Sequence, residues 1–412
     1  MVNSKIFIQI ASYRDRQLIP TIEDCIQKSK YPKNLKFCIA WQHDEEENLD
    51  VYKKDSRFII LDIPYKESKG VCWARNQIQQ QYKNEKYTLQ IDSHHRFIDE
   101  WDVEMIKMVK DLQDDGIKKP IISSYLPSYF PDNDPNGRIM EPWILNIERF
   151  LPEGAVFLRP ASMPDWQNRQ RPYPSRFLSG HFIFTLGKFN KEVPYDPDFY
   201  FHGEETSLAV RAFTHGYDLF NPHKIIAWHE YSRENSQKHW DDHSSWSDKD
   251  KKSYARFRTL FGMDNGSEDI GNYGFGKVRT LSDYEHYAGL KFNTRQIHEE
   301  VLNGDTPPVK GNYIKGLKNK IKTCVSIYKG SLTENDYTLF VLAMLDKNGN
   351  DLFRRDIEEN EIRNLLNENP KDKFIHMWVD YDDNVLPYSS RFWPHSKIKG
   401  WRERTEQVIK YE

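Results

Sequence analysis

The side chains best suited to chemistry lie at Asp92, His94 and His95, directly after the apolar run Tyr87–Ile91. A short apolar run of this kind predicts a buried β-strand, whose end would deliver the three side chains to the edge of a sheet. A carboxylate oxygen together with imidazole nitrogens suits a borderline divalent metal such as Mn²⁺. A solvated loop after an edge strand is the alternative, and the Asp-x-His spacing alone does not decide between the two.

A third ligand for such a metal follows another apolar run. Residues 219–228 predict a strand that ends at His229, which makes this histidine the best partner for Asp92 and His94. Packing of the His229 ring in the core is the alternative. His95 is expected to support the site or the fold rather than to bind metal, because successive side chains of a strand point to opposite faces.

The elements that must position these residues alternate between strand and helix. Periodic apolar residues predict strands at 5–11, 35–42, 57–63 and 87–91, and helices at 18–28, 70–81 and 101–112. Such alternation is typical of a parallel α/β sheet, in which ligands bind beyond the carboxyl ends of the strands. Ser12, Gln42 and Asp92 should meet at that edge. No glycine-rich dinucleotide motif or P-loop follows a strand, which argues against dehydrogenases and P-loop enzymes.

The sequence changes character after residue 125. Residues 127–174 are rich in Pro, Asn, Asp and Gly, and we expect a long loop that faces the substrate. A strand-like run at 177–185 and a helix at 206–214 follow, and residues 234–252 are hydrophilic. The predicted organisation is an α/β domain over residues 1–310, a linker over 311–329, and a small, mainly β C-terminal domain over 330–412.

The predicted C-terminal domain contains one clear hairpin. Apolar runs at 337–345 and 352–357 flank Asn348-Gly349, a pair typical of hairpin turns. Further strands are expected at 374–379 and 398–407. Most aromatic side chains here should form the core of the small domain, and exposed ones would be free to hold an acceptor or to mediate self-association. The aromatic residues concerned are Trp378, Tyr381, Tyr388, Trp393 and Trp401.

The overall composition narrows the class of protein. The 412 residues carry 59 basic and 62 acidic side chains, and a net charge of -3 gives no support for nucleic acid as a partner. The 4 cysteines form no C-x-x-C pair and no disulfide-like spacing, which fits a reducing cytosol. The first residues lack a signal-peptide core, and no run of about twenty apolar residues occurs. We expect a soluble, cytoplasmic protein without a membrane span.

Several short motifs, in this order and at this spacing, make residues 4–293 resemble a known family. They are I-A-S-Y-R-D (10–15), G-V-C-W-A-R-N (70–76), Q-I-D-S-H-H-R-F (90–97), S-G-H-F-I-F-T (179–185), F-H-G-E-E (201–205), W-H-E-Y-S-R (228–233) and Y-G-F-G-K-V-R-T-L-S-D-Y-E (273–285). This region resembles the cytoplasmic hydroxyproline N-acetylglucosaminyltransferase family. Asp92-Ser93-His94 also matches the D-S-H metal motif of the mucin-type polypeptide N-acetylgalactosaminyltransferases, a more distant likeness. Residues from 317 onward lie outside the resemblance, and nothing in the sequence indicates hydroxyproline as the acceptor.

The resemblance implies a GT-A α/β fold, a UDP-sugar donor, a divalent metal and retention of the anomeric configuration. By this likeness Asp92, His94 and His229 bind Mn²⁺ or Mg²⁺, which neutralises the charge that grows on the diphosphate as the glycosidic bond breaks. Arg233 resembles a basic residue that touches the diphosphate, a group to which a planar guanidinium is well suited. An ordinary surface arginine is the alternative.

The other nucleotide contacts are expected near strand ends and a helix start. Arg75 and Asn76 lie near the start of a predicted helix, which attracts anions, although an exposed helix face is the alternative. Ser12 to Arg14 follow the first strand as candidates for uracil and ribose contacts, with a polar turn as the alternative. The expected nucleotide-binding set is Ala11, Ser12, Tyr13, Arg14, Gln42, Arg75, Asn76, Ser93, Gly180 and Arg233.

The donor sugar is expected to lie near a pair of carboxylates. The resemblance places Glu204 at the sugar hydroxyls, in the position of the Glu of a G-G-E-N motif, and Glu205 where that motif has Asn. Acidic residues before a helix also favour the helix dipole, which is the alternative role. Gly180 and His181 are expected to line the sugar pocket, since glycine lets the backbone approach a ligand. Glu204, Glu205 and His181 are therefore the expected catalytic residues.

The function expected from these residues is transfer of GlcNAc from UDP-GlcNAc to a hydroxyl on a protein or glycan acceptor. A carboxylate nucleophile and a same-face attack both stay open as mechanisms, and so does a homo-oligomer. The first alternative function is a metal-dependent hydrolase that uses Asp92, His94, His95 and His229 to activate water. The second is a scaffold that binds a glycan or protein without turnover.

Overall fold

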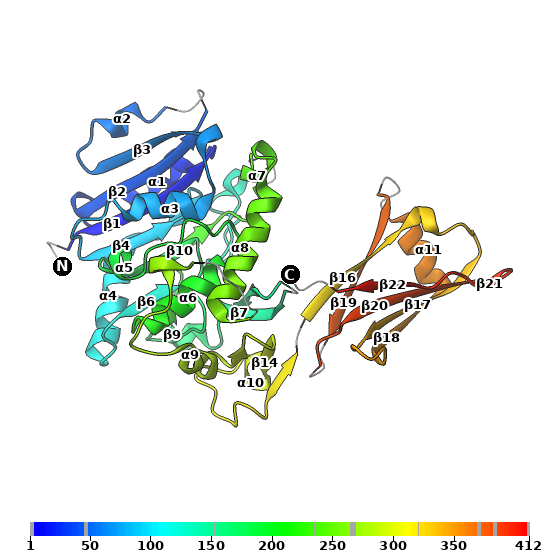
Figure 1. The fold of residues 1–412 in the computed structure, drawn as a ribbon. Helices are drawn as coiled ribbons and strands as arrows, with labels where there is room; N and C mark the ends of the chain where they lie inside the picture. The colour runs from blue at the N-terminus through cyan, green and yellow to red at the C-terminus, as the bar shows by residue number, and fades with distance from the viewer. Residues whose placement is uncertain are drawn as a thin grey trace.

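An eight-stranded sheet forms the centre of the first part of the molecule (Figure 1), in the order β3-β2-β1-β4-β10-β6-β11-β9. The computed structural model describes residues 4–44, 48–151, 153–233, 236–263, 269–319, 321–368, 372–381 and 385–409. The strands of this sheet are β1 (Ile6–Tyr13), β2 (Leu35–His43), β3 (Phe58–Pro64), β4 (Tyr87–Ile91), β6 (Pro120–Ser123), β9 (Tyr173–Pro174), β10 (Phe182–Leu186) and β11 (Asp218–Asn221). The pairs β1/β2, β1/β4 and β2/β3 are parallel, as the sequence predicts, and β10 enters antiparallel between β4 and β6.

Helices cover both faces of this sheet, so its central strands are apolar on both sides. On one face Ile8 of β1 belongs to the same apolar cluster as Ile22 and Met105, which lie on α1 (Leu18–Gln27) and α4 (Trp101–Asp114). On the other face Phe7 packs with Ala74 of α3 (Val71–Gln79). The remaining helices of the first part are α2 (Asp50–Lys53), α5 (Phe189–Glu192), α6 (Glu204–Thr214), α7 (His239–Asp242), α8 (Trp246–Phe261), α9 (Leu281–Ala288) and α10 (Glu299–Leu302).

The parallel register aligns the ends of neighbouring strands. Tyr13 at the end of β1 lies opposite Gln42 of β2, and Ile10 lies opposite Ile91, the last residue of β4. A small antiparallel sheet joins this edge, formed by β5 (His95–Phe97) and β12 (Ala227–His229), in which His229 pairs with His95. Residues from three distant parts of the sequence therefore meet beyond the carboxyl end of β4.

Two predictions for the middle of the chain are wrong. The segment 127–174 is not a single irregular loop, because β7 (Trp143–Phe150) and β8 (Val156–Ser162) form an antiparallel hairpin within it. The predicted strand 219–228 is two strands, β11 and β12, in different sheets. Pro222 lies between them, and proline cannot donate to a strand ladder. The hydrophilic segment 234–252 contains α7 and the start of α8, except for residues 234–235, which lie outside the described residues.

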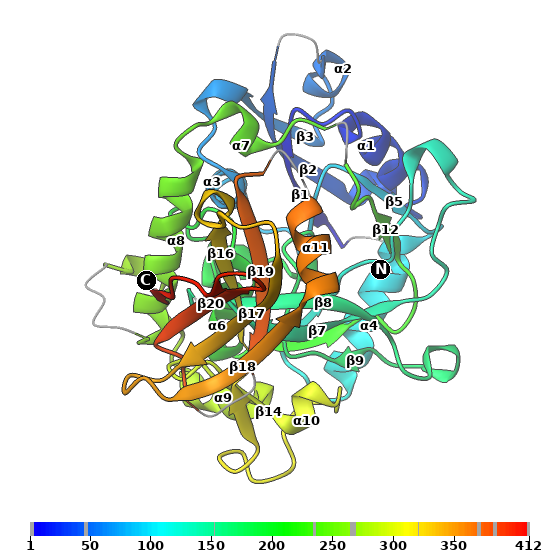
Figure 2. The same ribbon diagram turned by 90° about the vertical axis from the view of Figure 1, so that its right-hand side faces the viewer.

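The C-terminal strands form two sheets packed over a separate apolar cluster that includes Phe340, Leu342 and Met377 (Figures 1 and 2). One sheet, in the order β19-β16-β7-β8, adds β16 (Ile321–Tyr328) and β19 (Phe374–Tyr381) to the hairpin of the first part. The second contains β17 (Tyr337–Leu345), β18 (Asp351–Glu358), β20 (Ser389–Ser396), β21 (Gly400–Trp401) and β22 (Thr405–Val408). The predicted hairpin is present as β17/β18, with Gly349 at a φ of 83° in its turn.

Three features of this region differ from the expectation. The helix α11 (Glu359–Asn367) was not predicted. The stretch 311–329, expected as a linker, contains β16 and also β15 (Leu317–Asn319), which pairs with β14 (Gln296–His298) next to β13 (Leu290–Lys291). Backbone pairing of Ile321 with Phe150 and packing of Leu386 against the core of the first part link the two parts. The division into domains at residues 310 and 330 stays a prediction.

Of the five aromatic residues expected to lie mostly in the core of the C-terminal region, four have described side chains, and none of these four is buried. Trp378, Tyr388 and Trp401 are exposed, and Trp393 is only half-buried. Along β19 the buried residues are Ile375, Met377 and Val379, so that the alternate residues, including Trp378, point outward. The side chain of Tyr381 lies outside the described residues. None of the described helices is long and apolar enough to cross a membrane.

Candidate active site

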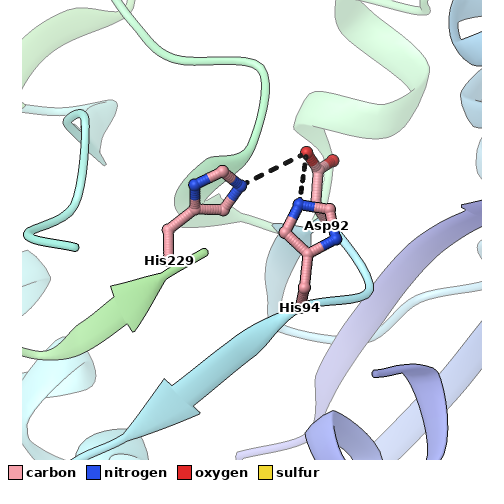
Figure 3. Close-up of side chains that lie close together, drawn as sticks. All are labelled: Asp92, His94 and His229. Carbon is pink, nitrogen blue, oxygen red and sulfur yellow. Dashed lines mark ion pairs between the residues drawn. The ribbon is translucent and has the colours of Figure 1, made fainter. Parts of the chain in front are cut away.

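Three predicted ligand residues converge beyond the end of β4. Asp92 Oδ2 lies 3.8 Å from His94 Nε2 and 3.7 Å from His229 Nε2. One ligand atom from each residue lies within 4.8 Å of the other two. Figure 3 shows both imidazole rings directed at the Asp92 carboxylate. Oxygen and nitrogen atoms at these separations are too far apart for hydrogen bonds, but close enough to share one divalent cation.

The carboxylate of Asp92 is held from behind by Arg75 of α3. Arg75 Nη2 donates to Asp92 Oδ1 at 2.8 Å, which leaves Oδ2 facing the imidazoles. Burial alone would raise the pKa of Asp92, but His229 and the Arg75 guanidinium hold it well below its usual range. Asp92 is therefore ionised at neutral pH, as a metal ligand would have to be.

His94 is held through its second ring nitrogen. His94 Nδ1 lies 2.7 Å from Asp15 Oδ2, and Ser93 Oγ donates to the same oxygen at 2.7 Å. A proton on Nδ1 leaves the lone pair of Nε2 facing Asp92, the tautomer that a metal ligand needs. Burial would raise the pKa of Asp15, whereas His94 and Arg233 lower it to well below its usual range. Asp15 belongs to the I-A-S-Y-R-D motif, but its role was not predicted.

The ring of His229 lies in a closely packed group of imidazoles. It stacks on His181 at 4.1 Å between ring centroids and lies 4.9 Å from His95. Both ring nitrogens of His229 are buried without a hydrogen-bond partner. Burial lowers the pKa values of His95, His181 and His229 to well below the usual range, so these rings are neutral at pH 7. A buried, neutral imidazole with a free nitrogen fits a metal ligand.

His95 and His181 pack against His229, and Nε2 of His95 is buried without a hydrogen-bond partner. His95 Nδ1 lies 3.1 Å from the backbone oxygen of Asp92. His181 Nε2 accepts a hydrogen bond from the Leu126 backbone at 3.2 Å, while its Nδ1 lies 2.9 Å from Ser179 Oγ. Both rings thus pack around His229, which agrees with a supporting role for His95.

The two glutamates of α6 have different partners. Glu204 Oε1 accepts hydrogen bonds from Arg75 Nη1 and, at 2.8 Å, from the hydroxyl of Tyr195. Glu205 accepts from the Gly180 backbone and from the Tyr125 hydroxyl, both at 2.7 Å. Burial, and then the charge of Glu204, raise the pKa of Glu205 to about 7. Arg75 therefore joins Glu204 to Asp92.

The residues expected around the nucleotide lie in two places. At the end of β1, Tyr13 donates to Asp242 of α7 at 2.8 Å, and Arg14 forms ion pairs with Asp242 and Asp44 at 2.9 and 2.8 Å. Gln42 donates to the Ser12 backbone at 3.0 Å. The hydroxyl of Ser12 is buried without a partner, and Ala11 is partly buried in the same strand.

Two other members of the expected set are engaged inside the protein. The terminal nitrogens of Arg75 are paired with Asp92 and Glu204, so they are not free for phosphate. Asn76 donates to the Tyr195 backbone at 2.7 Å and does not reach the triad. Arg233 lies near the triad, because its Nη2 is 3.3 Å from Asp15 Oδ2, the same oxygen that contacts His94.

Sequence reasoning missed Asp15, Tyr125, Tyr195 and Asp242. Each acts through a hydrogen bond to a residue far away in the sequence, such as the bond between Tyr13 and Asp242, 229 residues apart. Only Asp15 carried a usable signal, because it closes a loop directly after a predicted strand, as Asp92 does.

The chain matches one protein family in sequence. The model of the family described as "Glycosyltransferase (GlcNAc)" matches residues 5–57 and 50–294, which is more than half of the 412 residues. Among curated proteins, none matches the chain in sequence.

Solved structures provide more distant matches. GalNAc-T7, in a crystal structure with UDP, GalNAc and Mn²⁺, is 15% identical with a TM-score of 0.45, over 68% of this chain and 54% of that one. This chain thus spans little more than half the length of GalNAc-T7. Residues 1–349 of S. aureus TarS are 13% identical with a TM-score of 0.38, over 64% of this chain and 67% of that one. A TarS structure in complex with UDP gives 12% identity and a TM-score of 0.37, with the same coverage.

We predict that His229→Ala removes Mn²⁺ binding by the purified protein. Substitution of residues that merely orient a ligand costs 10–100-fold in metal affinity, so loss of a ligand should cost at least about 100-fold. Isothermal titration with MnCl₂ measures this. His298→Ala is the control, because His298 is buried but lies at the start of α10. Equal Mn²⁺ affinity in wild type and His229→Ala would contradict the assignment.

We also predict that the wild type loses stability relative to the Glu205→Gln variant as the pH rises. Folding raises the pKa of Glu205 from 4.5 to about 7, so the folded protein favours the protonated side chain. The stability that this group contributes is therefore fully present below pH 4.5 and is lost as the pH rises through about 7. The shift corresponds to at most about 3 kcal/mol at 1.36 kcal/mol per pKa unit. Melting temperatures from pH 5 to pH 8 test it, with the exposed Glu67→Gln as control. A difference from wild type that does not change with pH would refute the prediction.

Proposed function

The chain belongs to the GlcNAc glycosyltransferase family, and on that premise we propose that it transfers N-acetylglucosamine from UDP-GlcNAc to a hydroxyl of a protein or glycan. The proposal includes a divalent metal, Mn²⁺ or Mg²⁺, held by Asp92, His94 and His229, and retention of the anomeric configuration. The observation that carries it is the convergence of these three ligand atoms within 4.8 Å at the carboxyl end of a central strand.

The bound metal would neutralise the negative charge that develops on the diphosphate leaving group. The protein's own residues prepare that position. Arg75 fixes Asp92 with one oxygen free, and Asp15 fixes the His94 ring with Nε2 free. Arg233, close to the triad, is the residue proposed to contact the diphosphate. A guanidinium binds phosphate oxygens through two parallel hydrogen bonds, which also orients the group.

The donor sugar is proposed to lie between the triad and the start of α6. Glu204 is bound to the same Arg75 as Asp92, so a sugar held at Glu204 would have its anomeric carbon close to the metal-bound diphosphate. Gly180 donates its backbone N–H to Glu205, and a side chain at residue 180 would meet Glu204 Oε1 at 2.7 Å. The absence of a side chain at Gly180 thus lets Glu204 and Arg75 approach the backbone closely.

The uridine is proposed to bind at the end of β1, near Ser12, Tyr13 and Gln42. The ring of Tyr13 lies 5.1 Å from that of His239, and its hydroxyl is bonded to Asp242 of the same helix. Arg14 contacts the Tyr65 ring at 4.5 Å. Aromatic and polar groups of this kind suit a uracil ring and its ribose.

The proposed compartment is the cytosol. All 4 cysteines are free thiols, and Cys25, Cys38 and Cys72 are buried. Burial raises the pKa values of these three thiols, which makes them poor nucleophiles. Free, unreactive cysteines are typical of a reducing environment.

The proposed reaction is tested with a panel of UDP- and GDP-sugars at fixed Mn²⁺, with UDP or GDP release measured with and without hydroxyl-bearing peptides and oligosaccharides. We expect UDP-GlcNAc to be the best donor, release to stop in EDTA, and Asp92→Asn to be inactive. Preference for a GDP-sugar would refute the assignment of UDP-GlcNAc as the donor. Undiminished nucleotide release in EDTA would refute the requirement for a divalent metal. Cleavage that no acceptor accelerates would favour a hydrolase, and binding without release would favour a scaffold.

The acceptor is proposed to contact the outer face of β16 and β19. On this face Tyr328 pairs with Phe374 across the strands, Ser326 with His376, and Cys324 with Trp378. Exposed fractions of 52% for Tyr328, 42% for Phe374 and 54% for Trp378 leave their rings accessible. In Figure 1 the C-terminal strands lie on the side of the first part toward which β1 runs, the side of the triad. Rings that alternate with neutral polar groups suit the faces of sugars.

We therefore predict that Phe374→Ser and Trp378→Ser weaken transfer to the best acceptor of the peptide and oligosaccharide panel. The expected rise in acceptor KM is about 2- to 10-fold for each variant, from a stacking contribution of about 0.5–1.5 kcal/mol per ring pair. UDP release in the absence of acceptor should stay unchanged. Trp401→Ser, in the other sheet and 44% exposed, is the control. An unchanged acceptor KM in both variants would remove this face from the acceptor site.

A further inference from the structure

We infer that Asp15 is a positioning residue that couples the metal ligand His94 to Arg233, through one carboxylate oxygen shared by both. The inference rests on the proposed function, because it assumes that the triad binds a divalent cation and that Arg233 meets the diphosphate. It assigns a role to a residue that neither contacts the proposed donor nor belongs to the ligand triad.

Asp15 lies in the loop after β1 and is almost completely buried, with 2% of its surface exposed. Its Oδ2 is the common partner of His94 Nδ1 at 2.7 Å, Ser93 Oγ at 2.7 Å and Arg233 Nη2 at 3.3 Å. Its Oδ1 accepts from the Gln17 backbone at 2.9 Å, which fixes the carboxylate plane. A buried carboxylate is costly unless it is paired and hydrogen-bonded, and these partners meet that need for Asp15.

The contact with His94 decides which ring nitrogen faces the metal position. Nδ1–H donates a hydrogen bond to Asp15, and the lone pair of Nε2 then points at Asp92 Oδ2, 3.8 Å away. Without the carboxylate, the ring loses both its preferred tautomer and its orientation. Carboxylates that hold ligand imidazoles in this way raise metal affinity, although they never touch the metal.

The contact with Arg233 keeps a strained residue close to the triad. Arg233 has a φ of 37°, in the left-handed region that is unfavourable for an arginine, and its Nε is buried without a hydrogen-bond partner. Lys238 Nζ donates to the Arg233 backbone oxygen at 2.8 Å. Strain of this kind persists where the surroundings fix the residue, and the charge of Asp15 is the attraction that fixes the guanidinium.

Through these two contacts Asp15 connects His94 with Arg233. The loop after β1, the D-S-H segment and the segment after β12 are brought to one oxygen atom. Asp15 contacts only Nη2 of Arg233, so a diphosphate on the metal would meet the guanidinium while Asp15 keeps both of its partners. Arg233 is thus held within reach of the diphosphate before the donor arrives, which lowers the entropic cost of binding.

The first test measures Mn²⁺ affinity of the full-length protein without nucleotide, from the electron paramagnetic resonance signal of free Mn²⁺. Asp15→Ala should weaken binding by about 10–100-fold. Asp15→Asn, which has the same shape and still offers an oxygen to Nδ1–H, should lose less than Asp15→Ala. Arg233→Ala should stay within about threefold of wild type, because Arg233 is not a ligand.

Asp102→Asn is the matched control for loss of a buried carboxylate. Asp102 is also 2% exposed and accepts backbone hydrogen bonds from Lys30 and Tyr31 at 2.8 and 3.0 Å, away from the triad. It should lower the melting temperature but keep wild-type Mn²⁺ affinity. Wild-type affinity in both Asp15→Ala and Asp15→Asn, or an equal loss in Asp102→Asn, would overturn the role of Asp15 at His94.

The second test is a double-mutant cycle on UDP affinity at saturating Mn²⁺. Arg233→Ala should weaken UDP binding by about 10- to 100-fold in the wild-type background, since it removes a charged hydrogen bond to the diphosphate. In the Asp15→Asn background the same substitution should cost less than about threefold, because Arg233 is no longer aimed. Equal costs in both backgrounds would overturn the coupling. Absence of Mn²⁺ or UDP binding in the wild type would instead refute the proposed function itself.

Discussion

The buried guanidinium of Arg75 is the interaction on which the arrangement of the site depends. It lies between Asp92 at the end of β4 and Glu204 at the start of α6, with only 4% of its side chain exposed. Two carboxylates this close to a set of neutral rings would be costly to keep ionised without a cation between them. Arg75 supplies that cation from a third element, α3, and fixes the distance between the proposed metal and sugar positions.

A second constraint comes from the pairing of β5 with β12. This short sheet places His229 opposite His95, and the backbone N–H of Glu230 donates to the His94 backbone at 3.1 Å. The His229 backbone N–H also donates to the Pro127 backbone oxygen at 3.0 Å, so the backbone of this residue is held from both sides. Because burial keeps His95, His181 and His229 uncharged, the rings pack against one another without repulsion. The rings of His95 and His181 thus pack directly against His229 of the triad.

The C-terminal sheets depend on the first part of the molecule through one of its own hairpins. The strands β7 and β8 extend into the sheet of β16 and β19, and Trp143 at the start of β7 lies 6.1 Å from Tyr231, next to His229. The same four-stranded sheet therefore connects the surroundings of the triad with the aromatic face of β16 and β19. Inside the sandwich, alternate residues such as Val325 and Ile327 form the apolar cluster, which leaves the rings on the other side outward.

Local patterns in the sequence determined much of this structure. The strand and helix order through residue 125 and the Asn348-Gly349 hairpin follow from periodicity and turn chemistry, and they agree with the observed sheets. The order of the short motifs indicated a glycosyltransferase family, which agrees with the family match. Asp92, His94 and His229 were predicted as a group because each follows an apolar run, and parallel strands end at one edge of a sheet. The structure brings these three together.

Only the tertiary structure decided what each polar group is bonded to. Asp15 and its partner His94 are 79 residues apart, and Arg75 and its partner Glu204 are 129 residues apart. No local pattern in the sequence encodes such pairs. For this reason Arg75 appeared to be a phosphate ligand in the sequence, whereas both its terminal nitrogens are occupied by carboxylates. Periodicity reports which face of an element is buried, but a hydrogen bond depends on distances between elements, and packing alone sets those distances.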